Sequence, residues 1–215
     1  TAMEYRYMPP VARLIEEIHN GSIGDLKMLS IREHRFPFLV KVNDWNRFSK
    51  NSGGTLVEKC CHFFDLMRLI TKSEVTSVFA TGNQDNNHLD ESYDGKTPDI
   101  IDNAFVVLDF DNGVRGSLDL CMFAENSKVQ EEICAVGHKG KIETGVPSDA
   151  SGQHSSELSI RLREKNETFS ETVEVDQKIL KAGSHHGSTF YEHQSFINAI
   201  QNKTEAEVSL DDGLK

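Results

Sequence analysis

The sequence predicts an α+β fold, an open-faced, mostly antiparallel mixed β-sheet with helices packed on one face. Two observations carry this prediction. Strand-like segments follow one another over residues 74–175, and hairpin-type turns join several of them; Asp111-Asn112-Gly113 is the strongest such turn. Apolar residues at helical spacing mark residues 9–24, 53–70 and 187–203 instead. Helices on one face would leave the other face to solvent or to a second sheet.

The first elements alternate between strand and helix. Residues 1–10 are predicted to be part of a strand that begins before the first residue of this sequence. The following helix carries Pro9 and Pro10 in its first turn, where a missing N–H costs nothing, and Asn20-Gly21 should end it. A strand over residues 27–35 leads into a polar loop that contains the only tryptophan, Trp45.

The second half predicts neighbouring strands and a closing helix. The strand-like segments cover residues 74–82, 103–113, 114–123, 130–144, 156–164 and 168–175. Polar stretches at residues 84–97 and 148–156 predict surface loops. The helix over residues 187–203 is expected to turn its apolar side inward, with Phe190, Phe196, Ile197 and Ile200.

Composition limits the partners and the compartment. The net charge of −11 argues against nucleic acid and anionic membrane surfaces, because both require basic patches. No apolar run is long enough to span a bilayer. The four cysteines form no CxxC pair, so a reduced, cytoplasmic protein is expected.

Residues 53–70 contain the main candidate site. Gly53 and Gly54 form a turn that opens an apolar helix, and Glu58, His62 and Asp65 interrupt the apolar run at i, i+4 and i+7. A largely buried helix must satisfy such a polar stripe within the protein or present it to a cleft.

Three interpretations of this stripe remain open. In a structural one, Glu58 hydrogen-bonds His62 and Asp65 pairs with Arg68 or a neighbouring segment. In a catalytic one, His62 is a general base whose tautomer Glu58 fixes. In a third, Glu58 and His62 bind a metal ion, but no further His or Cys motif completes a recognised ligand set, so no metal is expected.

The stretch SGGTLVEKCCHFFDLMRLI resembles the signature of the Gfo/Idh/MocA family, the relatives of glucose–fructose oxidoreductase and inositol dehydrogenase. Other segments match the family in order: YRYMPPVARLIEEIHNGSIGDL, DWNRFSKNSGG and the closing HHGSTFYEHQSFINAIQNKTEAEVSLDDGLK. The resemblance covers almost the whole chain. It implies an NAD- or NADP-dependent oxidoreductase that acts on a sugar, cyclitol or related polyol.

The resemblance also implies a domain arrangement. Residues 1–24 would be the end of a nucleotide-binding Rossmann domain with its connecting helix. Residues 25–215 would be the sheet domain, which binds substrate and forms the oligomer, and it is expected to be truncated at the C-terminus. Asp211 and Asp212 are typical of the start of a helix, but no helix is expected after them in this chain. The glycine-rich fingerprint and the Glu-Lys-Pro motif of the family are absent, so this fragment alone is expected to be inactive. A homo-oligomer through the sheet face is expected.

The same resemblance implies that His62 moves the hydroxyl proton as hydride is transferred. Glu58 stands where the family usually has Asp. Asp65, together with Gly53 and Gly54, is expected to support the helix. Weaker substrate-binding candidates are Arg6, Trp45, Arg47, Lys59 and His186. Lys59 is expected to be solvated or at the rim of the core. The alternatives are a non-catalytic binding or oligomerisation module of the same fold, or NAD-assisted glycoside cleavage.

Overall fold

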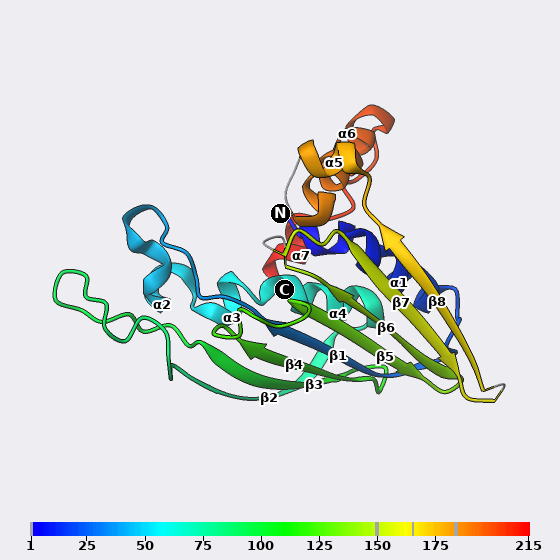
Figure 1. Ribbon diagram of the computed structural model, residues 1–215, viewed down its shortest axis with the longest axis horizontal. Coiled ribbons are helices and arrows are strands. Elements are labelled where there is room, and N and C mark those ends of the chain that lie inside the picture. The colour runs from blue at the N-terminus through cyan, green and yellow to red at the C-terminus, as the bar shows by residue number, and fades with distance from the viewer. Residues whose placement is uncertain (1, 149–150, 165, 183–184) are drawn as a thin grey trace.

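The computed structural model describes residues 2–148, 151–164, 166–182 and 185–215 (Figure 1). Its strands form one mixed sheet in the order β2-β3-β4-β1-β5-β6-β7-β8. Strands β1 and β4 run parallel, and the other neighbouring pairs are antiparallel. The predicted α+β fold is confirmed. The strands are β1 (Leu26–His34), β2 (Val75–Asn83), β3 (Asn103–Phe110), β4 (Arg115–Cys121), β5 (Glu131–Gly137), β6 (Gly140–Val146), β7 (Ser155–Leu162) and β8 (Glu167–Glu174).

Helices cover one face of this sheet. Figure 1 shows α1 and α4 lying across it, while α5 and α6 rise from its edge. The helices are α1 (Pro9–His19), α2 (Ser49–Ser52), α3 (Thr55–Glu58), α4 (Cys61–Thr71), α5 (Gln177–Ala182), α6 (Ser188–Asn202) and α7 (Leu210–Leu214), with 3₁₀ segments η1 (Glu4–Tyr7), η2 (Val42–Arg47) and η4 (His185–Gly187). As predicted, Gly21 follows the end of α1 with a positive φ of 79°.

The core lies between these helices and the sheet, and strand periodicity separates the two faces. In β3, Val106 and Leu108 are buried against the helices, whereas Phe105 and Val107 are 61% and 46% exposed on the opposite face. From the helix side, Leu14, Phe63 and Met67 join the same core. The sheet is therefore open on one face, as the sequence predicted.

Both ends of the chain differ from expectation. The predicted first strand is wrong: residues 4–7 form the 3₁₀ segment η1. The prediction that no helix follows the terminal aspartates is also wrong, because Ser209 and Asp212 form a capping box that starts α7. The two ends lie together, since the Arg6 guanidinium donates to the Glu207 carbonyl at 3.4 Å.

Two further segments are divided where the sequence predicted one element. Residues 130–144 form the hairpin strands β5 and β6, which pair antiparallel around residues 138–139. Residues 53–70 form two helices, α3 and α4, instead of one. The second division decides the geometry of the candidate site.

The orientation predicted for the closing helix is wrong. In α6, Phe196, Ile197 and Ile200 are 55%, 46% and 62% exposed, and Phe190 is 38% exposed. This helix contacts η1 and η4 and does not lie on the sheet (Figure 1). Its apolar side is consequently not covered by the described residues.

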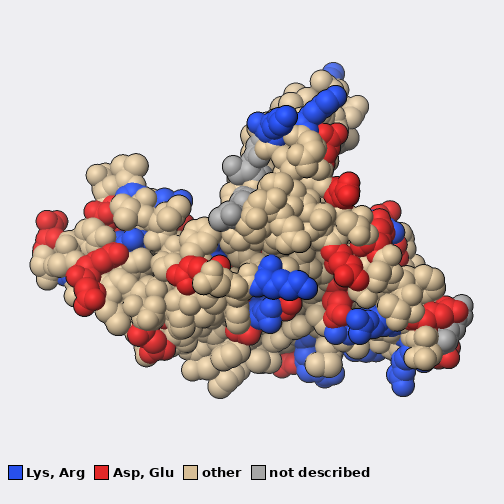
Figure 2. All heavy atoms as spheres, viewed as in Figure 1, with Lys and Arg blue, Asp and Glu red and all other residues tan. Residues whose placement is uncertain are grey.

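The surface carries both signs of charge. On the face shown in Figure 2, Lys and Arg are interspersed with Asp and Glu over the sheet region. Within the described ranges, no helix combines the length and apolar character needed to cross a membrane.

Candidate functional site

The glycine turn that opens α3 is held in a backbone conformation that glycine favours. Gly53 and Gly54 have φ values of 78° and 80°, and Gly54 is the N-cap of α3. A Cβ on Gly53 would lie 2.8 Å from Val57. The Thr55 hydroxyl donates to the Ile101 carbonyl and ties the turn to the segment before β3.

The backbone widens between α3 and α4. The Thr55 carbonyl accepts from Lys59 N at 3.0 Å and from Cys60 N at 3.2 Å, and this second, i to i−5 bond is of π-helical type. The wider turn changes the register between Glu58 and His62. Among the described contacts there is no hydrogen bond between these two side chains, so the structure does not join the predicted pair.

His62 instead packs against the N-terminal segment. Its ring stacks on Tyr5 with centroids 4.8 Å apart and planes 13° apart. Its Nδ1 is buried and has no hydrogen-bond partner among the described residues. Burial, helped by the Lys59 ammonium, lowers the pKa of His62 to about 4. At neutral pH the imidazole is therefore uncharged, which is the form that can accept a proton.

Lys59 is buried and ion-paired, so the expected solvated or rim position is wrong. The residue is only 7% exposed. Its Nζ lies 3.1 Å from Glu33 Oε1 and also donates to the Tyr5 hydroxyl. The Tyr5 hydroxyl in turn donates to Glu131 Oε1 at 3.2 Å. Burial and the neighbouring carboxylates raise the pKa of Tyr5 well above its usual range, so this hydroxyl keeps its proton.

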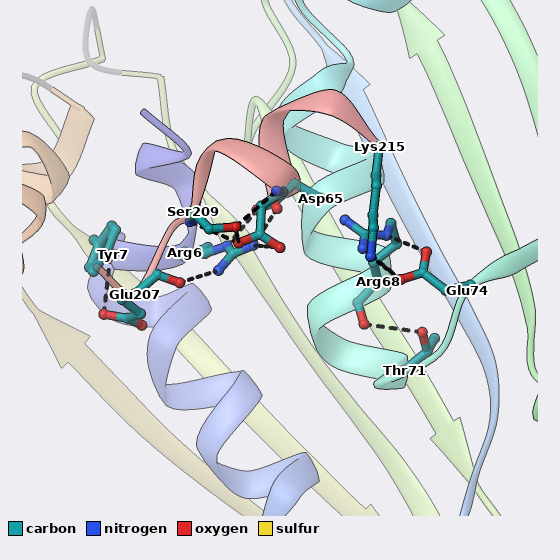
Figure 3. Close-up of polar contacts among 10 residues, drawn as sticks. Arg6, Tyr7, Asp65, Arg68, Thr71, Glu74, Glu207, Ser209 and Lys215 are labelled. Carbon is teal, nitrogen blue, oxygen red and sulfur yellow. Dashed lines mark hydrogen bonds and ion pairs between the residues drawn. The ribbon is translucent and has the colours of Figure 1, made fainter. Parts of the chain in front are cut away.

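Asp65 pairs with Arg6 and not with Arg68. The Arg6 Nε donates to Asp65 Oδ2 at 2.6 Å, and its Nη2 donates to Oδ1, with both side chains at most 7% exposed. Figure 3 shows this pair between η1 and α4, beside α7. Arg68 instead forms a bidentate pair with Glu74 at 2.8 and 2.7 Å. Arg6, a candidate substrate residue, thus has its guanidinium engaged in joining the chain ends to α4.

The loop candidates lie apart from His62 along the chain. The Arg47 side chain is 2% exposed; its guanidinium donates to Glu91 at 2.7 Å and to the Phe38 carbonyl at 3.1 Å. It therefore holds two loops together. Trp45 lies in the same loop and is 37% exposed. Substrate roles for both residues remain predictions.

His186 lines a small cavity. The residue is 3% exposed, and its Nε2 lies 2.6 Å from the Pro147 carbonyl. The cavity has a volume of about 200 Å³, and its polar wall includes Arg35, Gln130 and Glu131. The apolar side chains of Met8 and Phe36 also line this cavity, and His62 is not among its lining residues.

Glu33 and Glu131 were not among the site residues predicted from the sequence. Glu33 has no exposed side-chain surface, and Glu131 is 3% exposed. Each is in phase with the buried residues of its strand, Leu29 and Ile31 in β1 and Ile133 in β5. A glutamate at a core-facing strand position is the signal that could have found them. In the part of the chain that is described, no group of three His, Cys, Asp or Glu side chains is placed to hold a metal ion.

Comparison with known proteins gives one sequence relative of note. The chain is 30% identical over 191 residues to a myo-inositol 2-dehydrogenase from Thermotoga maritima, and this match covers 85% of the chain and 54% of that protein. The chain therefore spans about half the length of the curated relative it matches.

Solved structures share the fold. A probable dehydrogenase from Thermotoga maritima matches at 26% identity and a TM-score of 0.69, covering 99% of this chain and 58% of the other. A levoglucosan dehydrogenase in complex with NADH and levoglucosan matches at 19% identity and 0.73, covering 99% and 59%. Gal80p from Saccharomyces cerevisiae, in a super-repressor mutant form, matches at 17% identity and 0.69, covering 97% and 53%.

The family model described as "Oxidoreductase family, C-terminal alpha/beta domain" matches residues 15–215. A mixed β-sheet with helices on one face agrees with an alpha/beta domain. The chain belongs to the Gfo/Idh/MocA oxidoreductase family, as its C-terminal α/β domain.

Proposed function

We propose that this chain is the substrate-binding and catalytic half of an NAD(P)-dependent oxidoreductase that acts on a sugar, cyclitol or related polyol. In this proposal residues 1–24 end the nucleotide-binding part, and residues 25–215 form the sheet domain. The sequence relative is a myo-inositol 2-dehydrogenase, and its name supports both the reaction class and a polyhydroxy substrate.

The observation that carries the proposal is the state of His62. It is a largely buried imidazole that is uncharged at neutral pH and can therefore accept a proton from a substrate hydroxyl. Tyr5 supports one face of the ring, which limits its orientation. In the oxidative direction His62 takes the hydroxyl proton while the carbinol C–H bond breaks and a carbonyl forms; in the reductive direction it returns the proton.

The cofactor supplies the other half of the chemistry. When bound, NAD or NADP accepts or returns the hydride. The uncharged His62 imidazole fits such a cofactor, because it can take the hydroxyl proton while the hydride leaves the carbinol carbon. The sequence has no glycine-rich phosphate-binding turn, so we place most of the cofactor site in a nucleotide-binding domain outside these residues. Glu58, in the first helix after the glycine turn, is proposed as a second polar contact to substrate.

A second candidate function is a non-catalytic one. Gal80p, solved as a super-repressor mutant, shares the fold. In a binding module, the Tyr5–His62 stack would serve packing only. The two functions differ in what His62 substitution does, which makes them separable by experiment.

The test is His62→Gln in a protein that also contains the nucleotide-binding domain. The proposal expects loss of NAD-dependent polyol turnover with an unchanged unfolding midpoint. His138→Gln is the matched control, because this histidine lies between β5 and β6 with its side chain 46% exposed. Retained turnover in His62→Gln, or its unfolding, would favour the binding module.

We also propose self-association through the open face of the sheet. Phe79 is 71% exposed, and its register partner Val107 is 46% exposed on the same face, next to Phe105. Apolar side chains that gather in this way mark interaction surfaces. Phe79→Glu is expected to shift the mass measured by light scattering towards the monomer, whereas an unchanged mass would exclude this face.

A further inference from the structure

A cluster of four buried polar side chains includes Tyr5, whose ring stacks on His62. Tyr5 comes from η1, Lys59 from the turn between α3 and α4, and Glu33 and Glu131 from β1 and β5. Each of the four residues is at most 7% exposed. Buried charges of this kind are stable only when they are paired or neutralised.

The two glutamates face each other directly. Glu33 and Glu131 are register partners in the β1–β5 pair, so their side chains leave the sheet on the same, helix-covered face. Two ionised carboxylates at that separation would repel strongly in a buried environment. One of them is therefore expected to be neutral.

The contacts identify Glu131 as the neutral one. Lys59 Nζ and Arg35 Nη1 lie 3.1 and 3.4 Å from the same atom, Glu33 Oε1. Within the described residues, Glu131 has no ion-pair partner; its Oε1 accepts from Tyr5 at 3.2 Å and from the Gln130 amide at 2.6 Å. Burial, followed by the charge of Glu33, raises the pKa of Glu131 well above its usual range.

An unpaired atom supports the same assignment. Glu33 Oε2 is buried and has no hydrogen-bond partner among the described residues. Both hydrogen bonds of Glu131 end on its Oε1, which leaves its Oε2 to carry a proton. A proton on Glu131 that is donated to Glu33 Oε2 would give this oxygen a hydrogen-bond partner. It would also remove the repulsion between the two carboxylates.

We propose that Glu131 is a neutral carboxylic acid that donates its proton to Glu33, and that these two residues, with Lys59 and Tyr5, form the positioning element for His62. The cluster holds the Tyr5 hydroxyl from two sides, and Tyr5 in turn supports the His62 ring. The positioning role rests on the proposed function; the shared proton does not.

Other titratable groups face the pair from two sides. Arg35, after β1, approaches Glu33, and His185 and His186 line the cavity that Glu131 also lines. The experiments on the pair therefore vary Glu33 and Glu131 themselves, and leave these three groups unchanged.

The first test compares urea unfolding at pH 7. Glutamine reproduces a protonated glutamate, so Glu131→Gln is expected to keep or raise the unfolding midpoint. The double variant Glu33→Gln/Glu131→Gln should lower it markedly, because Lys59 then loses its carboxylate. A fall in Glu131→Gln as large as that in the double variant would overturn the proposal.

The second test detects the proton directly. The infrared spectrum of the chain at pH 7 should contain a carboxylic-acid carbonyl band that Glu131→Gln lacks. Glu132→Gln is the matched control, because Glu132 is the next residue in β5 and its side chain is 47% exposed. A band that persists in Glu131→Gln, or that is absent from the unsubstituted chain, would refute the neutral acid.

The third test addresses His62 by NMR titration of its ring. In Lys59→Met/Glu33→Gln, which removes the Lys59–Glu33 ion pair, the His62 pKa should rise because the Lys59 ammonium is gone, although burial of the ring keeps it below the ordinary value of about 6.5. In Glu131→Gln it should not change. An unchanged pKa in the double variant would refute the positioning role. Neither result depends on turnover, so failure here and failure of the proposed function are distinguishable.

Discussion

The Arg6–Asp65 pair provides a prediction whose size follows from the structure. Asp65→Asn removes the charge but keeps the shape, and it leaves a guanidinium that is 7% exposed without its carboxylate. Breaking a buried pair by removing one partner costs about 3–5 kcal/mol. Asp212, 3.9 Å from Arg6 and partly exposed, offsets about 1 kcal/mol of this. The expected loss of unfolding free energy is thus about 2–4 kcal/mol.

Urea unfolding followed by circular dichroism measures this loss. With a slope of about 2–3 kcal/mol per molar, the midpoint should fall by about 1 M at constant slope. Arg6→Met/Asp65→Leu removes both charges, and it should restore most of the stability because apolar replacements of buried pairs are often neutral. A loss below about 0.5 kcal/mol in Asp65→Asn would refute the claim that this pair joins η1 to α4.

Three further predictions concern the glycine turn, the protonation of His62 and the binding of the cofactor. Gly53→Ala should lower the unfolding free energy by about 1–2 kcal/mol in the same assay, because φ is 78° and the new Cβ meets Val57; an unchanged midpoint would show that the turn relaxes freely. The pKa of His62 is about 4 in the folded protein, so the unfolded chain binds more protons than the folded one between pH 6.5 and 4. The contribution of His62 to the unfolding free energy is complete above this window and should fall by roughly 2–3 kcal/mol as the pH drops through it. His62→Gln should reduce this dependence of the unfolding free energy on pH. Calorimetric titration of NAD or NADH into the chain alone should show no micromolar binding, and such binding would contradict our placement of the cofactor site.

Strand patterns explain how much of the fold the sequence predicted. In β3, alternation of Val106 and Leu108 with Phe105 and Val107 identifies both the strand and its buried face. The Asp111-Asn112-Gly113 turn predicts the β3–β4 hairpin, and Gly113 has the positive φ that such a turn requires. These features depend on neighbouring residues, so they can be read locally.

The errors arise where a contact is made by residues distant in sequence. The apolar side of α6 has helical spacing, but spacing does not say whether anything covers it. Lys59 is buried and paired with Glu33, which comes from a strand distant in sequence, and no local pattern around Lys59 indicates this partner. The i, i+4 prediction for Glu58 and His62 assumed a regular helix, which the widened turn at Lys59 and Cys60 replaces.

The most direct measurement of the central claim is the turnover number of His62→Gln in a protein with both domains, with NAD or NADP and a panel of cyclitols and sugars. Because general-base catalysis contributes about 10²–10⁴-fold, kcat should fall by at least about 100-fold while the urea midpoint stays within error and His138→Gln keeps full activity. A kcat within a few-fold of the unsubstituted enzyme would contradict the assignment of His62 as the proton-transfer residue.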